Sequence, residues 1–175
     1  LGAQIVGYEG VDKRIDVLAT AIRAKMTAVE LKDLDLAYAP PYSSAKDPVN
    51  MAGFMIDNIA NGTLKQWHLA DLESLPMDGS VTLLDARTVG EYRRGHIDGF
   101  LNIPVDDLRE RLNELDRSKP IYVICQSGLR SYIASRILEG NGFAAYNFSG
   151  GFRFYDTVIN DRALVESSFT CGMDK

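Results

Sequence analysis

Two spacings of apolar residues alternate along the second part of the chain, and they predict alternating strands and helices. Short apolar runs, most of them rich in β-branched residues, predict strands near residues 67–69, 80–87, 100–103, 121–124 and 144–148. Helical spacing between these runs predicts helices over 71–75, 88–94 and 105–115, and another that follows Gly128. Such alternation is typical of a parallel sheet with helices on both faces. We therefore expect an α/β fold with about five mainly parallel strands.

The beginning of the chain follows a different pattern, in which one strand precedes helices. Residues 1–7 read as a strand, and from Val11 to Met26 the apolar positions recur at helical spacing. Thr27, with Glu30 three residues later, forms a capping box for a second, short helix. This part of the chain is therefore predicted to be a small α+β segment.

A third helix is predicted after a proline-rich break. Asp47 and Pro48 suit its N-cap and first position, and Asn61-Gly62 suits its end. We expect this helix to bury Met51, Ala52, Met55, Ile56 and Ile59. One strand and three helices are poor material for a separate core, since a strand needs a sheet. We therefore expect residues 1–62 to be an incomplete domain, followed by a complete one over 63–165 and a tail over 166–175.

Composition and charge narrow the class of protein. A chain of 175 residues with 46% hydrophobic residues can form one good core and a further small unit. Its net charge of −5, without a basic run, argues against nucleic acid or an anionic membrane as a partner. The apolar runs are far shorter than the ~20 residues that cross a bilayer. Two widely separated cysteines do not form a disulfide framework, so we expect a reducing, cytoplasmic location and no metal site.

The most informative stretch joins a strand to a helix through Cys125. A polar turn follows the cysteine, and the first free N–H groups of a helix then point at the space above its sulfur. These groups and the helix dipole favour the thiolate, and Arg130 adds a cation or clamps the turn. The carboxyl ends of parallel strands are also where open sheets bind ligands. The hypothesis of a nucleophilic Cys125 requires that solvent reach its sulfur; the alternative is an inert, buried cysteine.

The motifs around Cys125 resemble those of one family. CQSGLRS, residues 125–131, resembles the active-site loop of the rhodanese-like sulfurtransferases. LLDARTVGEYRRGHIDGFLNIP, residues 83–104, is similar to the upstream segment of that family, and FSGGFRFY, residues 148–155, to its closing Gly-Gly helix start. The resemblance implies a rhodanese-like domain over 63–165 in which Cys125 carries a persulfide. It also implies that the following residues bind the transferred sulfur: Gln126, Ser127, Gly128, Leu129, Arg130 and Ser131.

Other residues near the predicted site are assigned supporting roles. Asp85 and Arg87 end their strand on the side that faces the cysteine, where one of them could bond the loop or pair with Arg130. We interpret His96 as structural, because transfer from an ionised thiol needs no base. Gly150-Gly151 is expected to serve backbone geometry near the cysteine. We expect Phe152, Phe154 and Tyr155 to form walls of the pocket or core. Cys171 is expected to lie in a frayed tail; the alternative is that it resolves an oxidised Cys125.

A second resemblance lies upstream. LDLAYAPPYSSAKDPVNMAGF, residues 34–54, resembles the end of the dimerisation domain in the FAD-dependent pyridine nucleotide-disulfide oxidoreductases of the coenzyme A-disulfide reductase and NADH oxidase group, some of which carry a C-terminal rhodanese domain. The resemblance implies that this chain is a fragment of a homodimeric parent that uses FAD, NADH and coenzyme A. The GxGxxG motifs are absent from this sequence, so we expect no cofactor in it. The resemblance also makes Tyr42 a candidate interface residue; the alternative is an ordinary turn tyrosine.

The length of the loop discriminates between reactions. Four residues, Gln126 to Leu129, separate Cys125 from Arg130, whereas cysteine phosphatases that share the fold use one residue more. The smaller loop favours sulfur transfer, in which a small-molecule sulfane-sulfur donor loads Cys125 and a thiol unloads it. The alternatives are an inert rhodanese-like interaction module and a cysteine-type phosphatase or arsenate reductase.

Overall fold

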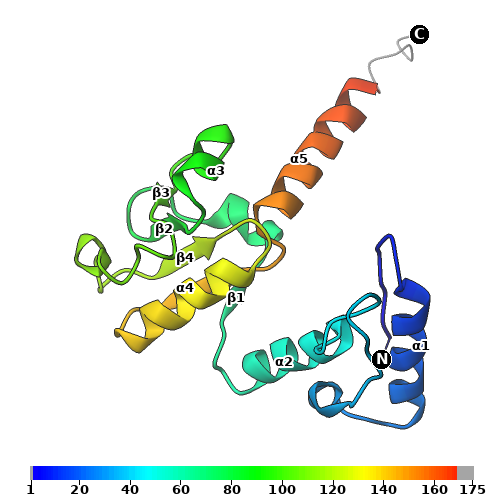
Figure 1. The fold of residues 1–175 in the computed structure, drawn as a ribbon. Helices are drawn as coiled ribbons and strands as arrows, with labels where there is room; N and C mark the ends of the chain where they lie inside the picture. Colours follow the sequence, from blue (N-terminus) through cyan, green and yellow to red (C-terminus); the bar gives the residue numbers. More distant parts are fainter. Residues whose placement is uncertain (1, 169–175) are drawn as a thin grey trace. The chain divides into compact units, whose positions relative to one another are not determined.

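The computed structural model describes residues 2–168 and divides the chain into two compact units, Leu1–Thr63 and Leu64–Lys175 (Figure 1). The first unit contains α1 (Val11–Arg23), a short 3-10 helix (Val29–Asp33) and α2 (Pro48–Ala60). The predicted caps are confirmed, because Glu30 accepts from the Thr27 N–H at 2.6 Å and Asp47 caps α2 with Pro48 at its first position. Its small core contains Ala21, Leu31 and Val49, with neighbours that include Leu18 and Leu34.

Two predictions for this unit are wrong. Residues 2–7 form no strand, and within residues 2–63 the regular structure is helical. A lone extended segment has no neighbouring strand to share its hydrogen bonds, so nothing holds it as a strand. The structure also turns α2 differently from our expectation. Four of its apolar residues are between 37 and 48% exposed, namely Met51, Met55, Ile56 and Ile59.

The orientation of α2 follows from its polar and small residues. Asn50 is buried, and its amide donates to the carbonyl oxygens of Leu31 at 3.1 Å and Leu34 at 2.9 Å. Gly53, also buried, lets the backbone at Leu31 and Lys32 come close. Because one buried and one partly buried carbonyl depend on Asn50, this face of α2 packs inward and its apolar stripe is left half-exposed.

The second unit is built on a five-stranded, all-parallel sheet in the order β1-β5-β4-β2-β3. Its strands are β1 (Gln66–Trp67), β2 (Thr82–Asp85), β3 (Leu101–Asn102), β4 (Ile121–Ile124) and β5 (Ala145–Phe148). Its α-helices are α3 (Val89–Arg94), α4 (Leu129–Gly140) and α5 (Gly151–Ser168). Short 3-10 helices lie at Leu69–Ser74 and Leu112–Glu114. Figure 1 shows α4 beside β4, and α5 running away from the sheet. The expected α/β fold is confirmed.

Alternation along β4 explains why both faces of the sheet are covered. Ile121 and Val123 point into a cluster that includes Ala134 and Leu138 of α4. Ile124 points into the opposite cluster, against Trp67 and other aromatic residues. Successive strand residues face opposite sides, so a central parallel strand must be apolar throughout. Cys125 follows directly and belongs to the cluster on the α4 side.

The prediction of a helix over residues 105–115 is wrong. The segment consists of successive turns in which several N–H groups bond the carbonyl three residues back, for example Arg111 to Leu108 at 3.2 Å. Only Leu112–Glu114 forms a 3-10 helix. The Val105 N–H bonds the Ala86 carbonyl at 3.1 Å, which ties the segment to the end of β2. Leu108 and Leu115 are buried nevertheless, so turns satisfy the same apolar spacing that suggested a helix.

Candidate active site

Cys125 lies at the carboxyl end of β4, where a short loop leads into α4. We call residues 125–131 the Cys125 loop. The sulfur accepts hydrogen bonds from the Gly128 N–H at 3.1 Å and from the Ser131 hydroxyl at 3.2 Å. Gly128 has φ 105°, a conformation that glycine adopts at little cost, and this turn brings its N–H back toward the sulfur. The loop therefore places a backbone donor on the sulfur, together with a hydroxyl whose single hydrogen can go to the sulfur or to the Gly128 carbonyl oxygen at 3.1 Å.

The same cysteine is almost completely buried. Its exposed fraction is 1%, so the expectation that solvent reaches the sulfur is wrong for this conformation. Ser127 and Leu129, on either side of Gly128, are exposed, and Leu129 is 61% exposed. A reagent would have to displace part of the loop to reach the sulfur.

The start of α5 holds the Cys125 loop from the other side. The N–H groups of Phe152 and Arg153 donate to the carbonyl oxygens of Cys125 at 2.7 Å and Gln126 at 3.1 Å. Gly151 lies so close to the loop that an added Cβ would be 2.5 Å from the Ser127 nitrogen. The expectation that this glycine serves backbone geometry near the cysteine is confirmed.

Asp85 and Arg87 form a buried ion pair beneath the loop. The Arg87 Nη2 lies 2.7 Å from the Asp85 Oδ2, and both residues are at most 2% exposed. Arg87 also donates to the Gln126 Oε1 at 3.4 Å and to the Gly95 carbonyl at 2.8 Å, and its guanidinium lies 3.8 Å from the centre of the Phe152 ring. Arg87 thus contacts the loop, whereas neither residue pairs with Arg130. Their loop-holding role stays a prediction.

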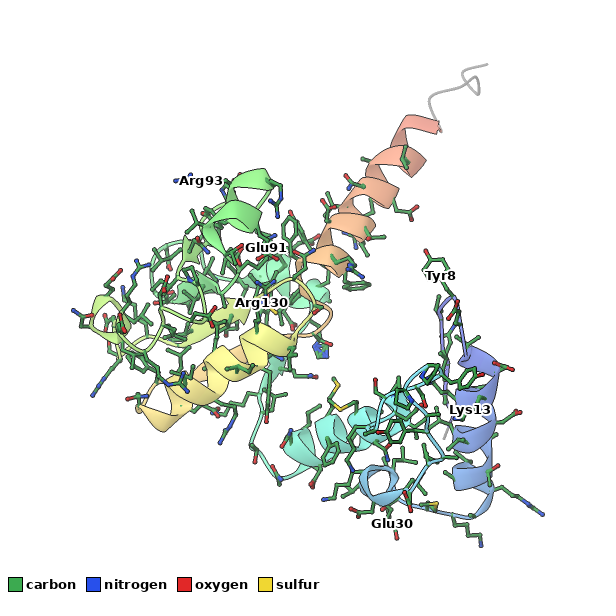
Figure 2. The ribbon with its side chains drawn as sticks, in the orientation of Figure 1. Tyr8, Lys13, Glu30, Glu91, Arg93 and Arg130 are labelled. Atoms are coloured by element: carbon green, nitrogen blue, oxygen red, sulfur yellow. The ribbon has the colours of Figure 1, made fainter. Side chains whose placement is uncertain are left out.

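Arg130 instead pairs with Glu91 of α3 (Figure 2). Its two terminal nitrogens lie 2.7 Å from the two carboxylate oxygens of Glu91. Arg130 is the main cause that lowers the pKa of the Glu91 carboxyl far below its ordinary value, and hydrogen bonds from Thr88 act in the same direction. The hydrogen bond to Glu91 is the main cause that raises the pKa of Arg130. Arg130 belongs to the Cys125 loop, so this ion pair joins the loop to α3.

Sequence reasoning assigned no role to Glu91. The Thr88-x-x-Glu91 spacing is visible as a capping box, and the structure forms it, with the Thr88 N–H 3.0 Å from the Glu91 Oε2. Its partner Arg130 follows 39 residues later, so local spacing could not pair them.

Two residues assigned minor roles lie outside these contacts. The His96 Nδ1 lies 3.1 Å from the Tyr92 carbonyl oxygen and its ring stacks on Tyr92 at 4.0 Å, in agreement with a structural role. Tyr42 belongs to the first unit and is 87% exposed, and its interface role is untested. Cys171 lies outside the described residues.

A cavity of about 360 Å³ adjoins the loop. It is lined by Arg87, Glu91, Arg94, Gly95, Gln126, Phe152 and Asp156. Of the three aromatic residues expected around the site, Phe152 lines this cavity, Tyr155 packs in the core and Phe154 is exposed. This cavity is therefore the candidate substrate pocket.

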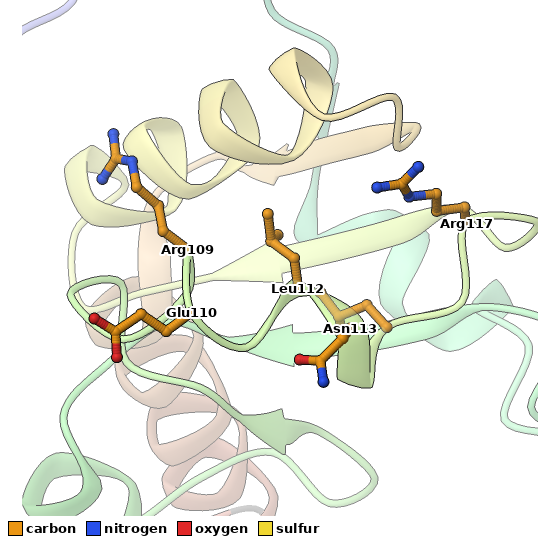
Figure 3. Close-up of a pocket in the computed structure, with 6 residues that line it drawn as sticks. Arg109, Glu110, Leu112, Asn113 and Arg117 are labelled. Atoms are coloured by element: carbon orange, nitrogen blue, oxygen red, sulfur yellow. The ribbon is translucent and has the colours of Figure 1, made fainter.

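A larger cavity, of about 520 Å³, lies elsewhere in the second unit (Figure 3). Arg109 and Arg117 stand at its two ends, with Leu112 between them. Its lining includes no residue of the Cys125 loop, so we assign it no part in the site. Within the described part of the chain, no group of three His, Cys, Asp or Glu side chains is placed to hold a metal ion. Nor does any helix in that part have the length and apolar character needed to span a bilayer.

The fold and the site define a family. Residues 68–156 match the family model described as Rhodanese-like domain, and the chain belongs to that family. The geometry above is therefore that of a rhodanese-like domain whose loop retains its cysteine.

Particular relatives extend the similarity to both units. The structure resembles that of reduced Bacillus anthracis CoADR-RHD, with 47% identity and a TM-score of 0.83, over 88% of this chain and 28% of that one. It also resembles a NAD-dependent persulfide reductase from A. fulgidus, with 42% identity and a TM-score of 0.73, over 85% of this chain and 26% of that one.

A curated relative matches a shorter region. The coenzyme A disulfide reductase of Staphylococcus aureus (strain bovine RF122 / ET3-1) is 56% identical over 54 residues, which is 31% of this chain and 12% of that protein. In all three comparisons the matching region is less than a third of the relative's own length.

Proposed function

We propose that this chain transfers sulfur through a persulfide on Cys125. The observation that carries the proposal is the pair of hydrogen bonds from Gly128 and Ser131 to the Cys125 sulfur. Donors that already converge on the sulfur can stabilise a thiolate and then the terminal sulfur of a persulfide. Membership of the rhodanese-like family supports the same reaction.

The reaction has two displacement steps. The Cys125 thiolate attacks the outer sulfur of a persulfide R–S–S⁻, a new S–S bond forms, the old one breaks, and R–S⁻ leaves. The enzyme is then Cys–S–S⁻. A thiolate acceptor attacks that outer sulfur in turn, and Cys125 leaves as the thiolate. Both steps conserve charge and need no added oxidant or reductant.

The burial of Cys125 adds a requirement. Because the residue is 1% exposed, the donor can react only when the loop surface around Ser127 and Leu129 moves aside. Loops can open with small free-energy costs, whereas β4 beneath the cysteine is central in the sheet. We therefore place the required motion in the loop and not in the strand.

The parent protein is part of the proposal. Similarity to a CoADR-RHD and to a persulfide reductase supports a parent in which a flavin site uses NADH to reduce the persulfide or disulfide, with coenzyme A as the carrier. This sequence lacks the glycine-rich dinucleotide motifs, so its own residues do not fit FAD or NADH. A cytoplasmic homodimer, with Tyr42 at the subunit interface, completes the proposal.

The direct test is to load and unload Cys125. The chain is incubated with thiosulfate or with the persulfide of 2-mercaptoethanol, separated from the donor, and analysed by mass spectrometry before and after cyanide. We expect one added sulfur atom on Cys125 and its release as thiocyanate. The Cys125→Ala variant should gain no sulfur, whereas Ser118→Ala, at an exposed residue of the second unit outside the Cys125 loop, should be loaded.

Other outcomes point to the alternatives. A wild-type chain that gains no sulfur from either donor would favour the inert interaction module. Turnover of an aryl phosphate or of arsenate that depends on Cys125 would favour the phosphatase or arsenate reductase.

A further inference from the structure

Two arginines are part of the site, Arg87 in contact with the Cys125 loop and Arg130 within it, and each is neutralised by its own carboxylate. Arg87 is paired with Asp85 in a buried contact at 2.7 Å. Arg130 is paired with Glu91, with both terminal nitrogens at 2.7 Å from the carboxylate oxygens (Figure 2). Such a bidentate pair uses the side of the guanidinium that would otherwise bind an anion. Neither arginine therefore offers an uncompensated charge to a ligand beside the sulfur.

Glu91 is held in place independently of Arg130. Its Oε2 accepts from the Thr88 N–H at 3.0 Å and from the Thr88 hydroxyl at 2.7 Å. The Glu91 N–H in turn donates to the Thr88 hydroxyl oxygen at 3.3 Å, which completes the capping box of α3. Because the cap fixes the carboxylate, an incoming anion must compete with a preformed partner for Arg130.

The cavity beside the loop is balanced in the same way. Besides Arg87 and Glu91, its charged lining residues are Arg94 and Asp156, which have opposite signs. Neither of these two belongs to any ion pair within the described residues. Arg87 and Glu91 are paired with Asp85 and Arg130, respectively. When these two partners are included, the formal charges of the side chains around the cavity sum to zero. An inorganic dianion finds no net attraction there.

We propose that Glu91, acting through Arg130, sets the class of sulfur donor: organic persulfides are accepted and doubly charged donors such as thiosulfate are disfavoured. The proposal rests on the sulfur transfer proposed above. Glu91 is a positioning residue, since it touches Arg130 and not the sulfur. Its effect is to keep the charge of Arg130 away from the donor.

Charge balance during the reaction explains the selectivity. A thiolate and a persulfide bring two negative charges together, and R–S⁻ leaves with one of them. A thiolate and thiosulfate bring three together, and sulfite leaves with two. The additional charge must be stabilised by a cation. Arg87 and Arg130 are already paired, and the charge of Arg94, the third arginine beside the cavity, is offset by the opposite charge of Asp156 in the same lining. The electrostatic cost of loading Cys125 is therefore larger with thiosulfate than with a persulfide.

The test compares donors in Glu91→Gln. Glutamine can still accept from Thr88, as glutamine does in other capping boxes, but it removes the charge that neutralises Arg130. We expect the second-order rate constant for loading Cys125 from thiosulfate to rise about tenfold, and that from the persulfide of 2-mercaptoethanol to change less than about twofold. Added salt should reduce the thiosulfate gain, because the freed Arg130 attracts the dianion electrostatically.

Two further variants isolate the pair. Glu139→Gln is the matched control, since Glu139 also pairs with an arginine of α4 and its side chain, like that of Glu91, is 20% exposed. It should leave the donor ratio unchanged. Arg130→Gln leaves the charge of Glu91 uncompensated, so it should lower the thiosulfate rate relative to the persulfide rate. This variant tests the proposal even if Glu91→Gln does not fold.

The outcomes separate this inference from the proposed function. A donor ratio that is the same in wild type, Glu91→Gln and Arg130→Gln would overturn the role of Glu91 while sulfur transfer stands. A wild type that also loads thiosulfate as fast as the persulfide would overturn it too. Failure of both donors to load the wild-type chain would instead remove the proposed function on which the inference rests.

Discussion

The Phe152 N–H lies 2.7 Å from the Cys125 carbonyl oxygen, so the start of α5 holds the backbone of the residue that carries the sulfur. The Arg153 N–H does the same for Gln126 at 3.1 Å. These bonds use the first N–H groups of a helix, which have no partner within the helix. The same loop directs the Gly128 N–H toward the sulfur at 3.1 Å.

Gly151 makes this close approach possible, and we predict that Gly151→Ala disrupts it. The new Cβ would lie 2.5 to 2.6 Å from loop backbone atoms, and φ at this position is +69°. We expect a loss of about 3 kcal/mol or more in the free energy of unfolding, measured with urea, because both strain and overpacking contribute. Alkylation of Cys125 should also change, since its loop must shift.

Gly142→Ala separates the two causes. This glycine has φ +85°, yet an added Cβ would meet nothing within 4 Å. The substitution should therefore cost only the conformational strain, about 1 kcal/mol. Equal losses for the two variants would show that contact with the loop contributes nothing.

Ser131 provides the second prediction, which concerns the chemistry of the sulfur. Its hydroxyl lies 3.2 Å from the Cys125 sulfur and 3.1 Å from the Gly128 carbonyl oxygen. Removing it in Ser131→Ala deletes one of two donors, so we expect the rate of Cys125 alkylation by iodoacetamide at pH 7 to fall about fivefold. Loading with sulfur should slow by a similar factor.

Ser135 offers a control one helical turn further along α4. Its hydroxyl oxygen is buried and has no hydrogen-bond partner among the described residues. Ser135→Ala should leave the alkylation rate unchanged and the stability equal or slightly higher, because an unpaired buried hydroxyl is lost. If both variants slowed alkylation equally, the contact between Ser131 and Cys125 would not be the cause.

The third prediction is a pH dependence of stability that arises from Glu91. Its hydrogen bond to Arg130 lowers the pKa of the carboxyl far below its value of about 4.3 in an unfolded chain. The charged form therefore stabilises the folded state above roughly pH 4.3, and this contribution is lost as the pH falls further toward the folded pKa. We expect wild type to exceed Glu91→Gln in stability by about 1 to 2 kcal/mol at pH 7.

Urea unfolding at several pH values measures this difference. It should be constant between about pH 6 and 8 and should shrink as the pH is lowered below about 4. A difference that grows on acidification would contradict the ion pair with Arg130.

The sequence predicted those parts of the site that are local. A strand, Cys125, a turn and a helix are consecutive, so their order fixes where the sulfur lies relative to α4. The contacts that complete the site join distant segments, as between Glu91 and Arg130 or between Phe152 and Cys125. No spacing rule reaches across such distances.

The failed predictions in the fold arose where polar groups decided the packing. The apolar stripe of α2 suggested a face that packs inward. Instead, Asn50 packs inward to bond one buried and one partly buried carbonyl, and the apolar stripe is left half-exposed. In the segment 105–115, a tie from Val105 to the end of β2 favoured turns over a helix. Apolar spacing identified the buried residues Leu108 and Leu115 correctly without identifying the backbone that buries them.

The ends of the sheet have a further consequence for the behaviour of the chain at high concentration. Each edge strand, β1 or β3, is only two residues long, so it presents few unpaired backbone groups along the rim of the sheet. Strands from another molecule therefore find little template on which to extend the sheet. Fibril growth by addition of strands at these rims is disfavoured by the architecture itself.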